Sequence, residues 1–100
     1  MDAFSAIAEP NRRVLLEAMR QKPCTVNTLV QVAGISQPAV SKHLKVLKEA
    51  NLVKVRPQGQ KRWYEVNADP LMEIDGFLEP YRLLLSNKLD ALEKHLDDME

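Results

Sequence analysis

Cysteine, aromatic residues and long apolar runs are all scarce in this chain. Cys24 is the single cysteine among 100 residues, so no disulfide can form within the chain, as is typical of a reducing compartment. No stretch approaches the roughly 18 consecutive apolar residues of a membrane span, and residues 1–13 lack the basic segment and apolar run of a secretory signal. We therefore expect a cytoplasmic protein that does not enter a membrane.

Motifs that carry catalysis are missing as well. The chain has three glycines and no Gly-rich phosphate loop, and neither G-x-S-x-G nor H-E-x-x-H occurs in it. Neighbouring acids such as Asp97 and Asp98 are typical of a solvated helix end. We therefore predict no catalytic residue and no cofactor, and we do not expect an enzyme.

The net charge of zero would by itself argue against nucleic-acid binding, yet the charges are distributed unevenly. Residues 1–36 carry four basic and three acidic side chains, residues 37–62 seven and one, and residues 63–100 three and ten. Because charges act locally in screened solution, the middle segment predicts a basic binding surface on an acidic body. A solvated basic face without a partner is the alternative that composition leaves open.

The chain is short enough to form one domain, residues 1–100. Its periodicities predict a mainly α fold with a β-hairpin (α+β). Helices are expected at residues 3–8, 10–20, 26–33, 37 to about 51 and 70–98, and strands at residues 52–57 and 61–66.

Two short helices joined by a tight turn form the centre of the predicted fold. Thr25 and Ser36 are good N-caps for them, and Gly34 supplies the left-handed residue that ends the first helix. Residues 25–50 therefore predict a helix-turn-helix. The alternating strands that follow, with Gly59 at their turn, predict a wing at residues 52–66. We expect a winged helix-turn-helix.

The last helix, residues 70–98, carries an apolar stripe that so small a domain cannot bury, so we interpret it as a dimerisation helix. The predicted interface residues on it are Leu71, Ile74, Leu78, Tyr81, Leu85, Leu89, Leu92 and Leu96. Pro80 lies inside this helix, where its ring would press on the carbonyl group of Gly76, so we expect a kink there.

The second helix of the pair and the hairpin hold the residues predicted to bind DNA. Gln37, Ser41 and Lys45 share one face at i, i+4 and i+8, and such side chains pair with base edges or phosphates. Lys61 and Arg62 beside the turn suit a minor groove or its phosphates. The complete predicted set is Ser36, Gln37, Ser41, Lys42, His43, Lys45, Arg56, Lys61 and Arg62. A solvated polar helix face and a charged hairpin tip without a partner remain the alternatives.

Two residues allow two interpretations each. His43 either donates to a phosphate or lies at the edge of the core. Cys24 precedes a helix start, where the helix dipole can lower a thiol pKa, whereas a small buried apolar side chain is the more common role for a free cysteine.

Two segments resemble the ArsR/SmtB family of winged helix-turn-helix repressors: FSAIAEPNRRVLLEAM and ISQPAVSKHLKVLKEANLVKVRPQGQKRWYEV. The resemblance covers about residues 3–98 and is most specific through residues 35–66. It implies a dimer through the first and last helices, which adds Phe4 to the predicted interface. It also implies operator contacts from Gln37, Ser41, Lys42 and His43, and wing contacts from Lys61 and Arg62.

One departure from the family concerns metals. Metal-sensing members carry a Cys-x-Cys pair where this chain has Thr25 and Asn27, and Cys24 lies just outside those positions. The last helix offers Asp75 and Glu79 without a nearby histidine, whereas a Zn²⁺ site requires about four N, S or O ligands. The C-terminal segment LEPYRLLLSNKLDALEKHL resembles the branch of the family without metal sites. We predict no metal ligands, and the inducing signal stays open.

These features predict a homodimeric, sequence-specific DNA-binding transcriptional regulator that acts as a repressor at an inverted-repeat operator in double-stranded DNA. Two other hypotheses remain open: a winged-helix module that binds another protein, and a metal- or redox-responsive repressor with an atypical site. The basic middle segment favours DNA, because a protein-binding face is richer in exposed aromatic residues.

Overall fold

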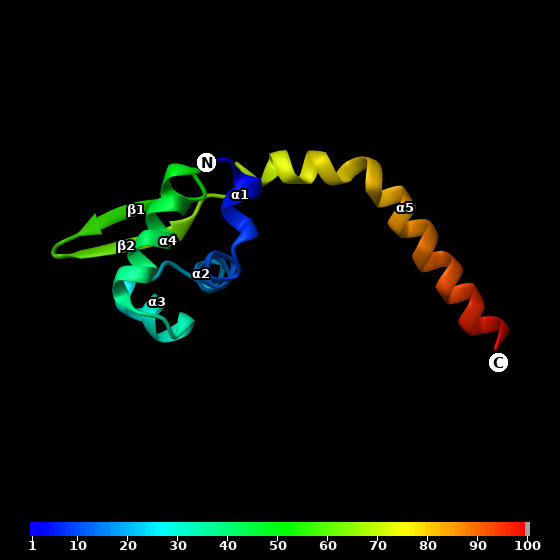
Figure 1. Cartoon of the computed structure of the whole chain (residues 1–100), viewed down its shortest axis with the longest axis horizontal. Coiled ribbons are helices and arrows are strands. Elements are labelled where there is room, and N and C mark those ends of the chain that lie inside the picture. Colours follow the sequence, from blue (N-terminus) through cyan, green and yellow to red (C-terminus); the bar gives the residue numbers. More distant parts are fainter. Residues whose placement is uncertain (100) are drawn as a thin grey trace.

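The computed structural model describes residues 1–99 and contains five helices and one β-hairpin within that range (Figure 1). The elements are α1 (Ala3–Ala8), α2 (Pro10–Gln21), α3 (Val26–Ala33), α4 (Gln37–Glu49), β1 (Val53–Gln58), β2 (Lys61–Val66) and α5 (Leu71–Asp98). This order confirms the predicted mainly α fold with a hairpin. Each strand and helix boundary lies within two residues of its expected position.

A single apolar core joins the four helices α1, α2, α3 and α4 with the hairpin. In α4, the residues at i, i+4 and i+7 are Val40, Leu44 and Leu47, and each is at most 3% exposed. They pack with the buried residues of the other elements, which include Leu15, Leu29 and Leu52. The opposite side of α4 is consequently left free for a ligand.

The junction between α1 and α2 is built from polar contacts. Glu9 ends α1 and is the N-cap of α2, where its carboxylate accepts a hydrogen bond from the amide of Arg12 at 3.0 Å. The guanidinium groups of Arg12 and Arg13 donate to the last four carbonyl groups of α1 at 2.6–3.1 Å. These carbonyls have no partner within a helix, so the two arginines fix α1 against α2.

Positive backbone φ angles end α3 and α4. Gly34 ends α3 in the left-handed conformation, with φ of 66°. Asn51 follows α4 with φ of 61°, a conformation that asparagine tolerates better than most residues with a side chain. The amide of Leu52 then donates to the carbonyl of Leu47 at 2.9 Å, which closes the helix end in the manner of a Schellman motif.

The hairpin is antiparallel and pairs Val53 with Val66 at its base and Gln58 with Lys61 at its tip. Gly59, with φ of 63°, begins the two-residue turn, as a hairpin loop of this length requires a positive φ. Tyr64 and Cys24 exchange two backbone hydrogen bonds of 2.8 and 2.9 Å. This bridge attaches the hairpin to the segment that leads into α3.

Cys24 itself is buried, with 4% of its surface exposed. Its thiol lies 3.3 Å from the carbonyl oxygen of Lys22, to which it donates. Burial raises the pKa of the thiol above its ordinary value, because a low-dielectric environment disfavours the thiolate. Cys24 therefore has the small buried role rather than that of an activated thiol.

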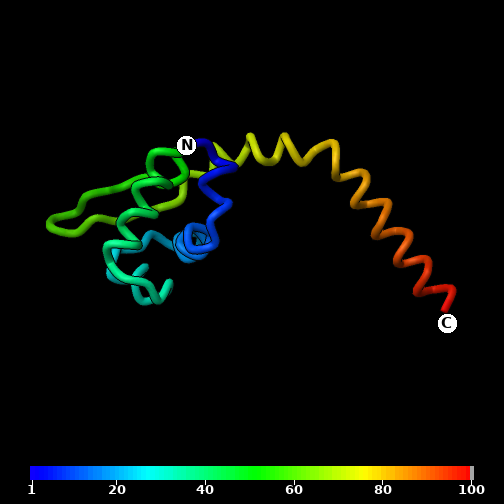
Figure 2. The backbone as a smooth tube through the Cα atoms, in the orientation of Figure 1, coloured from blue at the N-terminus to red at the C-terminus, as the bar shows by residue number. Residues whose placement is uncertain are grey.

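Helix α5 leaves the body and bends in the segment that carries Pro80, as expected (Figure 1). The backbone trace shows the N-terminus beside the body and the C-terminal end of α5 far from it (Figure 2). Leu71 and Ile74 are half-buried against the core, and Phe77 stacks edge-on against Phe4 at 5.5 Å between ring centroids. Within residues 1–99, no helix is both long and apolar enough to cross a membrane.

The apolar stripe of α5 has little cover from its own chain beyond these first turns. Its later members are 44–59% exposed: Leu78, Tyr81, Leu85, Leu89, Leu92 and Leu96. Apolar surface of this extent on one continuous helix is unusual for a monomeric protein.

Candidate nucleic-acid interface

Helix α4 presents one side to the core and another to solvent. Ser36 is its N-cap and accepts a hydrogen bond from the amide of Ala39 at 3.3 Å. The remaining polar residues predicted on its outer surface are exposed: Gln37, Ser41, Lys42 and Lys45. Ser36 is exposed as well, so the first turn of α4 is accessible to a ligand.

A hollow of about 190 Å³ lies between α4 and the hairpin. Ser41, Lys45 and Lys48 line it from α4, and Arg62 lines it from β2. The structure thus brings two residues of the predicted recognition helix together with one predicted wing residue. Arg56 lies across the hairpin, paired with Trp63 in the register and exposed.

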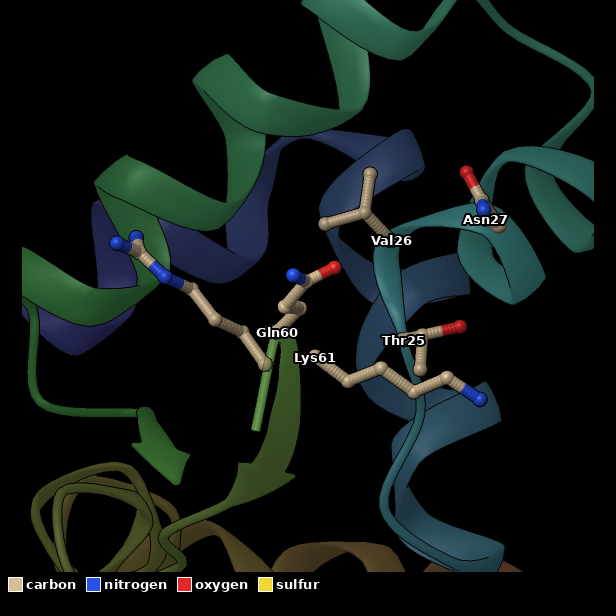
Figure 3. Close-up of a pocket in the computed structure, with 6 residues that line it drawn as sticks. Thr25, Val26, Asn27, Gln60 and Lys61 are labelled. Carbon is tan, nitrogen blue, oxygen red and sulfur yellow. The ribbon is translucent and has the colours of Figure 1, made fainter. Parts of the chain in front are cut away.

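A second cleft, of about 350 Å³, separates the hairpin tip from the start of α3. Figure 3 shows Gln60 and Lys61 across this cleft from Thr25, Val26 and Asn27. Sequence reasoning assigned no DNA contact to Thr25, Asn27 or Gln60. No local pattern indicates their proximity, because the backbone bridge between Cys24 and Tyr64 creates it.

The lysine and arginine side chains of α4 and the hairpin form no ion pair with a carboxylate of residues 1–99. Within this range, the basic and acidic groups less than 4 Å apart involve Arg20 and Arg82, and also His43, which forms an ion pair only when its imidazole is protonated. None of the seven basic residues of segment 37–62 takes part in one: Lys42, Lys45, Lys48, Lys54, Arg56, Lys61 and Arg62. All seven are exposed, so their positive charge is available to an anionic polymer.

His43 is the predicted residue that the structure separates from this group. Its Nε2 atom lies 3.7 Å from Oε2 of Glu9, and the side chain is 20% exposed. The structure therefore places His43 at the edge of the core beside the α1–α2 junction.

The described part of the chain contains no group of three His, Cys, Asp or Glu side chains arranged to hold a metal ion. The two carboxylates that α5 offers as possible ligands, Asp75 and Glu79, both pair with Arg82. Cys24 is buried.

Known proteins share both this sequence and this fold. A family model described as bacterial regulatory protein, arsR family, matches residues 9–55. The HTH-type transcriptional regulator Rv2034 of Mycobacterium tuberculosis is 43% identical over 79 residues, which are 79% of this chain and 74% of that protein. The transcriptional repressor SdpR of Bacillus subtilis is 31% identical over 72 residues, 72% of this chain and 80% of SdpR.

The crystal structure of NolR from Sinorhizobium fredii is similar to this fold with a TM-score of 0.66 and 35% sequence identity, and the match covers 78% of each chain. The chain belongs to the arsR family of bacterial regulatory proteins, and it is a transcriptional regulator with a winged helix-turn-helix fold.

Proposed function

We propose that the protein is a homodimeric transcriptional repressor that binds an inverted-repeat operator in double-stranded DNA. The observation that carries this proposal is the exposed side of α4 and the adjoining hairpin, whose seven basic side chains form no ion pair with a carboxylate of residues 1–99. The similarity to SdpR, a transcriptional repressor, supports the direction of regulation. A regulator of this kind acts on the chromosome, so the proposal includes a cytoplasmic location.

Within this proposal, the first turns of α4 enter the major groove. Gln37 and Ser41 hydrogen-bond to base edges, and Lys42 lies beside them, since N-terminal residues of a recognition helix usually reach the bases. Lys45, one turn further along, contacts phosphate. Ser36 caps the helix and is exposed at the same end.

The hairpin is the wing in this arrangement. Arg56, Lys61 and Arg62 bind phosphates or enter the adjacent minor groove, where negative potential attracts arginine and lysine. The hollow shared by Ser41, Lys45 and Arg62 supports a single surface that spans recognition helix and wing. In domain terms, the helix-turn-helix is residues 25–50 and the wing residues 52–66.

Residues 70–98 form the dimerisation helix of the proposal. The exposed stripe from Leu78 to Leu96 suits a partner with an apolar surface of the same length, and a second copy of α5 supplies one. Phe4 extends the interface onto α1 through its contact with Phe77. Two linked recognition helices read half-sites about 34 Å apart, one helical turn of DNA, or a multiple of that distance.

A salt titration tests the proposal. For nonspecific duplex DNA, the logarithm of the association constant should fall linearly with the logarithm of the salt concentration, because the bound protein displaces counterions from the phosphates. Lys61→Ala with Arg62→Ala should weaken binding to all sequences and reduce the slope by up to about 2. The matched control, Lys88→Ala with Lys94→Ala, removes two cations from α5 and should leave the slope unchanged. Binding that does not depend on salt would contradict the proposal and favour a protein partner.

A further inference from the structure

His43 and Ser41 belong to one helix but project in different directions. Successive residues of an α-helix are rotated by about 100°, so two positions correspond to roughly 200°. Ser41 is exposed on the side that the hairpin adjoins. His43 instead lies against Glu9, with Nε2 and Oε2 3.7 Å apart and with the two side chains only 20% and 32% exposed.

Glu9 occupies a structurally important position. Its carboxylate caps α2 through the amide of Arg12, and the guanidinium groups of Arg12 and Arg13 hold the end of α1. His43 therefore connects α4 to the junction at which α1 and α2 meet. At 3.7 Å the two groups are in contact without a direct hydrogen bond, and both side chains are partly shielded from water.

We propose that His43 is a positioning residue, which orients the recognition helix by its contact with Glu9 and does not touch DNA. This inference rests on the proposed function, because it concerns the orientation in which α4 meets the operator. Its physical basis is that His43 lies at the edge of the apolar face of α4, beside the buried Leu44 and Leu47, where its imidazole contacts the carboxylate of Glu9.

The same contact relates the recognition helix to the proposed dimer interface. Phe4 of α1 stacks on Phe77 of α5, and α1 is fixed to Glu9 by the two arginines. The path from Phe77 to His43 runs through the stacked rings, the backbone of α1, the hydrogen bonds of Arg12 and the contact between Glu9 and His43.

Glu9→Asp separates the two roles of Glu9. Aspartate is an equally good N-cap and keeps the charge, but its shorter side chain withdraws the carboxylate from His43. His43→Asn likewise shortens the reach of the donor, whereas His43→Gln keeps a donor close to the position of Nε2. Glu17→Asp is the matched control, because Glu17 makes an exposed pair with Arg20 on the same helix.

The measurement is the affinity for duplexes that the wild-type protein selects from a random-sequence library, at several salt concentrations. Glu9→Asp and His43→Asn should each weaken binding by about two- to fivefold per protomer, hence by roughly the square of that factor for a dimer. The variant that carries both substitutions should bind the duplex with the same affinity as the single variant of lower affinity. His43→Gln should restore most of the affinity, and the salt slope should stay at the wild-type value in every case.

Two results would overturn the role assigned to His43. One is a salt slope reduced by about 1 in His43→Asn, which indicates a lost phosphate contact. The other is wild-type affinity in Glu9→Asp. A wild-type protein that selects and binds no duplex would instead overturn the proposed function. In that case the contact is measured without DNA, from the unfolding free energies of Glu9→Asp, His43→Asn and the double variant. Additive effects of the two substitutions would show that Glu9 and His43 do not interact, which would also overturn the role assigned to His43.

Discussion

Replacing Leu85 and Leu92 with aspartate should dissociate the proposed dimer without unfolding the protomer. The two side chains are 59% and 55% exposed, and neither belongs to the apolar core or packs against it. A carboxylate at either position therefore stays hydrated in the isolated protomer. In a dimer the same carboxylate lies in an apolar interface.

The magnitude follows from these exposures. Full burial of a leucine side chain is worth about 1.5–3 kcal/mol, so about 1–1.5 kcal/mol per leucine remains available to a partner. Two leucines in each of two protomers together lose about 4–6 kcal/mol. Since 1.4 kcal/mol corresponds to about a tenfold change, the dimer dissociation constant should rise at least about a thousandfold. Unpaired buried carboxylates increase the effect.

Sedimentation velocity measures the association state, circular dichroism the helix content, and a gel shift the affinity for a selected operator. The affinity should fall by at least about a hundredfold, because a monomer loses the effective concentration that links two half-sites. The control is Met72→Asp with Leu83→Asp, two residues that are 73% and 69% exposed and lie off the stripe. A folded monomeric variant with wild-type operator affinity would refute the dimer reasoning, as would a variant that remains dimeric.

Three further predictions concern the thiol, a helix end and metals. In the folded protein at pH 8, Cys24 should react with Ellman's reagent at least about tenfold more slowly than in denaturant. Burial raises the pKa of this thiol, so the neutral thiol contributes its full stability below the ordinary thiol pKa, and this contribution is lost as pH rises above it. Urea unfolding between pH 7 and 10 measures the decrease in the free energy of unfolding. Asn51→Val should lower the free energy of unfolding by about 1–2 kcal/mol, whereas Asn51→Gly should not lower it; equal melts for the two would show that the left-handed φ has no cost. Zn²⁺ or a chelator should leave operator affinity unchanged, and a stoichiometric metal that survives dialysis and alters affinity would contradict this.

The helices and the hairpin were predictable because each boundary is encoded locally. Thr25 and Ser36 cap their helices through their own hydroxyl groups, and Gly34 and Gly59 adopt the positive φ angles that their turns require. Pro80 also acts locally, on the helix that contains it. A single sequence carries such signals in full, since the residues that interact are neighbours in the chain.

The site was predictable only in part, because its geometry depends on contacts between distant segments. The cleft at the hairpin tip exists because Tyr64 pairs with Cys24, and periodicity within either segment does not indicate that pairing. His43 lies beside Glu9, from which helices α2 and α3 separate it in the chain. Helical spacing placed Ser41 correctly on the surface but did not identify the carboxylate beside His43.

The division of charge along the chain acquires a spatial meaning in the folded protein. The hairpin tip and the C-terminal end of α5 lie at opposite ends of the longest axis (Figure 1), which extends over 61 Å. The basic segment 37–62 includes α4 and the hairpin tip, whereas the acidic segment 63–100 includes α5. Because this length is several times the Debye length of about 8 Å at physiological salt, the two charges do not cancel at the DNA surface. The acidic end is repelled by the phosphates and the basic end is attracted, so a chain without net charge approaches DNA in the orientation that the proposed recognition helix and wing require.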